Sequence, residues 1–60
     1  MQMNLPKDPV ILLSYVNTQL RDFYTNLDDF CQETGVDKEA LCQRLEMIDY
    51  TYDQGVRQFV

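Results

Sequence analysis

The sequence LDDFCQETGVDKEALCQRLE, residues 27–46, carries most of the information about the fold. Apolar residues recur in it at helical spacing on both sides of one glycine, Gly35. Glycine adopts the left-handed backbone conformation at low cost and commonly ends helices, and Asp37, two residues later, is a favourable N-cap residue. This segment therefore predicts two helices, over 26–35 and 37–48, with a tight turn between them.

The small and apolar residues of this segment fall where a helix-turn-helix needs them. Cys31 is a small residue within the first helix, Val36 follows the glycine in the turn, and Leu41 lies within the second helix. Val36 and Leu41 also occupy the positions of a hydrophobic staple around the cap of the second helix. The pattern indicates a helix-turn-helix geometry, which serves many roles and does not by itself specify DNA binding.

Upstream, residues 1–7 have the character of a short arm, and Asp8-Pro9 begins a further helix over 8–24. Asp8 can cap the free amide groups, and Pro9 fits the first helical position because an N–H there would have no helical partner. Helical spacing predicts that the core-facing stripe consists of Leu13, Val16, Leu20 and Phe23, widened by Leu12 and Tyr24. The polar residues expected to lie away from that stripe are Ser14, Asn17, Thr18 and Arg21.

Downstream of Asp49 the apolar pattern changes from helical spacing to alternation, which is typical of strands. Residues 50–52 alternate, residues 53–55 have turn composition, and residues 56–60 suit a returning strand, so we expect a β-hairpin over 49–60. A two-residue turn would place on one face Tyr50, Tyr52, Arg57 and Phe59. A three-residue turn would shift that register, and the sequence leaves both open.

The predicted order of elements is helix, helix, tight turn, helix and hairpin. It predicts an α+β, mainly α fold, with three helices in a helix-turn-helix, minimal winged-helix-like arrangement and a C-terminal two-stranded β-hairpin. Because 60 residues are near the lower limit for a fold without disulfides or metals, we expect a single domain over 1–60 that uses nearly all of its apolar residues.

An excess of acidic side chains argues against nucleic-acid binding. The chain has 10 acidic and 5 basic side chains and a formal net charge of −5, whereas affinity for nucleic acid comes mainly from Lys and Arg that neutralise phosphates. The exposed face expected for the helix over 37–48 carries Glu39, Gln43 and Glu46. A nucleic-acid-binding, winged-helix-like regulator is therefore the alternative function, and its contacting residues would be Lys38, Gln43, Arg44 and Arg57.

Residues suited to catalysis or metal binding are scarce, and we expect no enzymatic activity, cofactor or metal. The chain has no histidine, which removes the commonest general base and metal ligand. Cys31 and Cys42 stand 11 residues apart without a CxxC pair, which does not suit a zinc site. Asp28-Asp29 is explained by the first turn of a helix, where the helix dipole favours negative charge. With neither a recognisable secretory leader nor an apolar run long enough for a membrane span, we expect a cytoplasmic protein with reduced thiols.

The helix over 8–24 carries a second apolar face. On a helical wheel Ile11 and Tyr15 lie opposite the predicted stripe, with Leu12 between the two faces. A small monomer cannot easily bury both faces, so we expect Ile11, Leu12 and Tyr15 to form an interface for a second copy of the chain, as a homodimer, or for another protein. The alternative is that this face is covered by the hairpin or by the apolar arm residues Met1, Met3 and Leu5.

Several segments resemble a known family. They are NLPKDPVILLSYVNTQLRDFY near the start, VDKEALCQRLEMIDYTYD in the middle and QFV at the end. Over residues 4–60 the chain resembles the very short bacterial proteins of domain-of-unknown-function family 4250. The resemblance implies a small stand-alone bacterial protein and supplies no activity or functional residues. Among the polar residues of these segments, we expect Arg21 and Asp22 to be solvated or paired with a neighbouring element.

Overall fold

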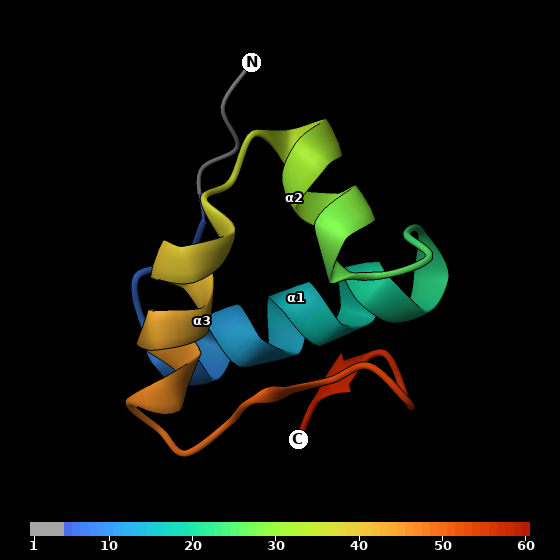
Figure 1. Ribbon diagram of the computed structural model, residues 1–60. Helices are drawn as coiled ribbons and strands as arrows, with labels where there is room; N and C mark the ends of the chain where they lie inside the picture. Colours follow the sequence, from blue (N-terminus) through green and yellow to red (C-terminus); the bar gives the residue numbers. More distant parts are fainter. Residues whose placement is uncertain (1–4) are drawn as a thin grey trace.

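Three helices and a two-stranded antiparallel hairpin follow one another in the expected order, which confirms the mainly α, α+β fold (Figure 1). The computed structural model describes residues 5–60. The helices are α1 (Pro9–Asp22), α2 (Leu27–Thr34) and α3 (Lys38–Glu46), and the strands are β1 (Tyr52–Asp53) and β2 (Gln58–Phe59). In Figure 1, α1 runs across the middle, with α2 above it, the hairpin below it and α3 beside its N-terminal half. Because α1 contacts α2, α3 and β2, it is the element around which the others are arranged.

Each helix begins at a capping residue, and two of these, Asp8 and Asp37, are the expected ones. The side chains of Asp8, Asn26 and Asp37 each accept a hydrogen bond from a backbone amide two or three residues later, at 2.9, 2.8 and 3.0 Å. Gly35 ends α2 in the left-handed conformation, with a φ of +77°. Because the capping residues stand outside the helices that they cap, the helices are shorter than the predicted ranges 8–24, 26–35 and 37–48.

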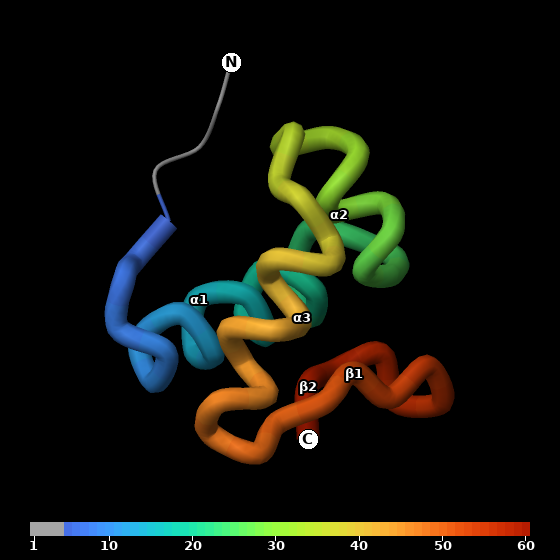
Figure 2. Tube along the Cα trace, turned by 60° about the vertical axis from the view of Figure 1, so that its left-hand side comes forward, coloured from blue at the N-terminus to red at the C-terminus, as the bar shows by residue number. Residues whose placement is uncertain are grey.

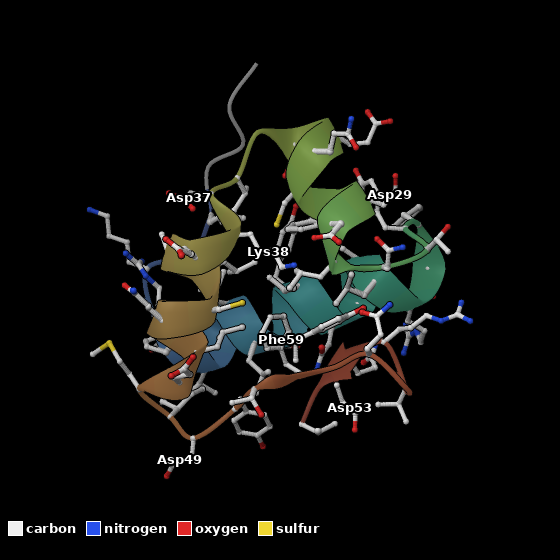
Figure 3. The ribbon with its side chains drawn as sticks, viewed as in Figure 1. Asp29, Asp37, Lys38, Asp49, Asp53 and Phe59 are labelled. Atoms are coloured by element: carbon white, nitrogen blue, oxygen red, sulfur yellow. The ribbon has the colours of Figure 1, made fainter. Side chains whose placement is uncertain are left out.

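The end of α3 is set by a turn at Asp49, which Figure 3 labels at the bend between α3 and the hairpin. The Tyr50 amide donates to the Leu45 carbonyl, and the Asp49 amide donates to the Glu46 carbonyl, both at 3.0 Å. These two bonds form a Schellman motif, and Asp49 occupies its left-handed position with a φ of +65°. Aspartate visits this conformation more readily than most residues, so the chain can leave the helix here without a glycine.

The hairpin has a longer turn than either of the two predicted lengths. Asp53 pairs with Gln58, so four residues, 54–57, join the strands. The Asp53 carboxylate accepts a hydrogen bond from the Gly55 amide at 2.7 Å, and the Asp53 carbonyl accepts one from the Arg57 amide at 2.7 Å. Arg57 therefore belongs to the turn, where its φ is +57°, and the two-residue turn that would place it on a strand face does not occur.

Two aromatic residues that pair across the strands attach the hairpin to the helices. The ring centroids of Tyr52 and Phe59 lie 5.5 Å apart, and Phe59 is buried between the hairpin and α1 (Figure 3). The Tyr52 hydroxyl accepts a hydrogen bond from the Leu27 amide at 3.2 Å. That amide belongs to the first turn of α2 and has no partner within the helix, so the hairpin also completes α2.

Asn17 of α1 covers the outer edge of β2. Its side-chain amide accepts a hydrogen bond from the Phe59 N–H at 2.8 Å and donates one to the Phe59 carbonyl at 3.1 Å. Thr51 and Val60 exchange both of their backbone hydrogen bonds, so the N–H and carbonyl of Phe59 point away from β1 and toward α1. Asn17 thus takes the place of a third strand, and the prediction that it lies on the outer side of its helix is wrong.

The core is built from the three helices and β2. Its buried apolar side chains are Leu12, Val16, Leu20, Leu27, Phe30, Cys31, Leu41, Leu45 and Phe59. On α1 the inward stripe begins at Leu12, whereas Leu13 is half-buried and packs against the core from the side. The prediction that Phe23 faces the core is wrong. Its side chain is 70 % exposed because α1 ends at Asp22, and the following backbone no longer continues the helical wheel.

Candidate interaction surfaces

The outward side of the first turn of α1 presents bare aliphatic side chains. Val10 is 63 % exposed and Ile11 is 57 % exposed, and Tyr15, one turn beyond Ile11, is half-buried at the edge of the core. We call Val10, Ile11 and Tyr15 the α1 start patch. Leu12, the third residue of the predicted interface, is only 1 % exposed. The prediction that Leu12 belongs to the interface is wrong, because the Leu12 side chain is buried in the core between α1 and α3.

The described part of the N-terminal arm does not cover Ile11. Leu5 is half-buried and packs against the core, and it lines a pocket together with Leu12, on the inward side of α1. The predicted covering residues Met1 and Met3 lie outside the described residues. Among residues 5–60, neither the arm nor the hairpin buries Val10 or Ile11.

The exposed face of α3 is acidic and polar, as expected, since Glu39, Gln43 and Glu46 are all exposed. The residue after α3, Met47, is 79 % exposed. The end of α3 and the start of α1 lie side by side in both Figure 1 and Figure 2. Met47 therefore adds apolar surface at the same end of the molecule as the α1 start patch.

The four residues of the alternative nucleic-acid face do not gather on one surface. Around α3, Gln43 lies about 140° and Arg44 about 240° from Lys38, at 100° per residue. The Lys38 ammonium pairs with the Asp28 carboxylate at 2.7 Å, and this hydrogen bond raises the pKa of Lys38. Arg57 lies apart from all three, in the hairpin turn beside the end of α1.

Arg21 and Asp22 are exposed, as expected, but they pair with each other and not with a neighbouring element. The Arg21 guanidinium donates to both oxygens of the Asp22 carboxylate, at 2.9 and 3.0 Å. This hydrogen bonding raises the pKa of the Arg21 guanidinium and lowers the pKa of the Asp22 carboxyl. The pair is solvated, so we assign it a local role on the surface of α1.

The two thiols are free and sheltered. Cys31 is buried in the core and Cys42 is half-buried, and burial raises the pKa of both thiols. A raised pKa lowers the thiolate fraction, which is the reactive form. Within residues 5–60 no cluster of three or more His, Cys, Asp or Glu side chains is arranged to hold a metal ion.

A pocket of about 250 Å³ lies between the start of α1, the turn after α2 and the first half of α3. Its lining residues are Leu5, Leu12, Thr34, Gly35, Val36, Asp37, Ala40, Leu41 and Arg44. The predicted staple residues Val36 and Leu41 form part of its wall. The pocket is not predictable from the sequence, because Leu5 and Leu12 reach it from a distant part of the chain and only tertiary packing brings them there.

The chain belongs to a protein family of unknown function. Residues 6–59 match the family described as Domain of unknown function (DUF4250), as the resemblance of its segments indicates. Comparisons with curated proteins and with solved structures found no match. Among the described helices, none has the length and apolar character needed to cross a membrane. The family description names no activity, so the functional argument depends on the surfaces described above.

Proposed function

We propose that this member of the DUF4250 family is a non-catalytic interaction module of the cytoplasm that self-associates through the α1 start patch. The observation that carries the proposal is the pair of neighbouring aliphatic side chains, Val10 and Ile11, both more than half exposed on the first turn of a well-capped helix. Val10 and Ile11 are adjacent on one helix turn, so together they leave a contiguous aliphatic surface in water, which favours a contact with another molecule.

The energetics favour a weak dimer. Burying a Val, Ile or Met side chain completely is worth about 1.5–3 kcal/mol, and these side chains are already partly buried in the monomer. In a symmetric dimer Val10, Ile11 and Met47 would be buried on both chains. If each side chain contributes about two thirds of the value for complete burial, the gross gain is about 6–12 kcal/mol. Association costs about 4–15 kcal/mol in lost freedom of motion. The gain and the cost nearly cancel, so this surface can support only a weak dimer, and we propose one with a Kd in the high-micromolar to millimolar range.

Analytical ultracentrifugation tests the proposal. The protein concentration should run from about 20 µM to about 1 mM, so that it spans the proposed Kd. The weight-average mass is expected to rise from the chain mass of 7.1 kDa toward twice that value. Ile11→Asp should hold the protein at the monomer mass, because a carboxylate cannot be buried in an apolar contact without a partner. Gln32→Asp is the matched control, since Gln32 is exposed on a different helix, α2. A parent protein that stays at the monomer mass throughout this range would refute self-association.

One observation favours the alternative of nucleic-acid binding, namely that α2, a tight turn, α3 and a hairpin follow in winged-helix order. The charges oppose it, because Glu39 and Glu46 are exposed on α3 and Lys38 is paired with Asp28. Fluorescence anisotropy with a labelled duplex at low salt separates the two proposals. Binding that weakens steeply as salt is added would support the alternative, and no binding at low salt would remove it.

A further inference from the structure

The pocket beside the start of α1 has apolar walls and one cationic group at its rim. Leu5, Leu12, Val36 and Leu41 supply aliphatic surface from three separate segments of the chain. Thr34 is the one buried polar side chain there, and its hydroxyl already donates to the Phe30 carbonyl at 2.7 Å. The walls therefore offer a bound group little besides apolar contact.

Arg44 differs from the other basic residues of the helices in having no acidic partner. Arg21 and Lys38 form ion pairs at 2.9 and 2.7 Å, and within residues 5–60 no such pair involves Arg44. Its neighbours one turn away along α3 are Ala40 and Leu41 on one side and Met47 and Ile48 on the other, all uncharged. An unpaired guanidinium beside an apolar pocket leaves its fork of donors free for an outside carboxylate.

One acidic side chain also lines the pocket, and one of its two carboxylate oxygens is already engaged. The Oδ1 atom of Asp37 accepts hydrogen bonds from the Glu39 amide at 3.0 Å and the Ala40 amide at 3.5 Å, as the cap of α3. The positive end of the α3 dipole lies at the same amides and offsets part of the negative charge. Arg44 is therefore the group at this rim that can accept an anionic ligand.

We infer that this pocket binds a small aliphatic carboxylate, with its hydrocarbon chain against Leu5, Leu12 and Leu41 and its carboxylate on Arg44. The size suits such a ligand. A dry aliphatic cavity of about 150 Å³ accepts benzene, so a pocket of about 250 Å³ accepts a chain of several carbons. The inference does not depend on self-association, because the lining residues are separate from Val10 and Ile11.

Titration of ¹⁵N-labelled protein with sodium octanoate, followed by NMR, tests the inference. We expect saturable shifts of the amides of Gly35, Val36 and Leu41, which line the pocket. Removing the charge with Arg44→Gln should weaken binding about tenfold, the usual worth of a hydrogen bond to a charged group. Arg57→Gln is the matched control, because Arg57 lies in the hairpin turn outside the pocket, and it should bind octanoate as the parent does.

A second titration with 1-octanol separates the carboxylate from the hydrocarbon chain. Octanol should bind the parent protein about tenfold more weakly than octanoate does. It should bind the Arg44→Gln protein and the parent with the same weak affinity, since only the carboxylate engages Arg44. Three results would overturn the inference: no saturable shift with octanoate, equal affinity for octanoate and octanol, or unchanged affinity in a folded Arg44→Gln protein. Circular dichroism establishes that the variant is folded.

Discussion

The inward and outward sides of α1 differ in how completely they are used. The inward side is engaged along its whole length, by α3 near Leu12, by the hairpin at Asn17 and by the core at Leu20. The outward side begins with exposed Val10 and Ile11. Neighbouring residues with similar side chains, such as Ile11 and Leu12, thus have opposite environments. The difference shows that hydrophobicity alone does not identify the core stripe of a short helix.

The largest effect expected on folding comes from replacing Leu12. Leu12→Ala should lower the free energy of unfolding by about 3 kcal/mol, because it removes most of a buried side chain that packs against the core. Ile11→Ala is the matched control and should change stability by less than about 0.5 kcal/mol, since its side chain is mostly in water. Urea denaturation followed by circular dichroism measures both. Similar losses from the two substitutions would mean that the assignment of inward and outward sides is wrong.

A somewhat smaller loss is expected at Asn17. Asn17→Ala should cost about 2 kcal/mol, because it leaves the N–H and carbonyl of Phe59 without their partners in a part-buried site. Hydrogen exchange should also become faster at the Phe59 amide than at the helix amides, as the hairpin loosens from α1. Thr18→Ala, at the exposed neighbouring position, should leave both quantities unchanged. Equal exchange rates in the Asn17 variant and the parent would contradict the edge-covering role.

The cap of α1 should contribute about 1 kcal/mol, which is typical for an N-cap aspartate. Asp8→Ala removes the acceptor for the Val10 amide and should fray the turn that carries Val10 and Ile11. Asp8→Asn retains an acceptor and should restore most of the stability. Thermal denaturation compares the three proteins. If Asn and Ala lower the melting temperature equally, the side-chain hydrogen bond is not the source of the effect.

The smallest effect on folding is expected from Ile11→Asp. Ile11 is exposed near the N-terminal end of α1, where the helix dipole favours a carboxylate, so the free energy of unfolding should change by less than about 0.5 kcal/mol. The same substitution should remove self-association. Urea denaturation at low protein concentration checks the first expectation, and a loss of several kcal/mol would mean that Ile11 supports the monomer itself.

The features predictable from the sequence are those that depend on residues close together in the chain. Asp8, Asp37 and Gly35 act on amides or backbone within a few residues of themselves, and the structure confirms each of these roles. The element order follows from them. The acidic outward face of α3 also follows, because helical spacing alone separates Glu39 and Glu46 from Leu41.

The features that the sequence does not predict depend on residues far apart in the chain. In the sequence Asn17 is an ordinary polar helix residue, and its role emerges only when Phe59, 42 residues later, is placed beside it. The four-residue turn depends on the bonds that Asp53 makes, which composition does not distinguish from a shorter turn. The choice of Leu12 over Leu13 for the core depends on where α3 packs. The same reason keeps the pocket beneath Leu5 hidden from sequence reasoning.

The most direct test of the proposed association surface is a concentration series of ¹⁵N–¹H NMR spectra of the full chain. Raising the protein concentration from about 50 µM to 1 mM, the range suggested by the affinity estimate, should shift the amides of Val10, Ile11 and Met47. The amides of Gln32 and Glu33, exposed on α2, should not move. Spectra that do not change with concentration, or shifts confined to the hairpin or α2, would contradict the account.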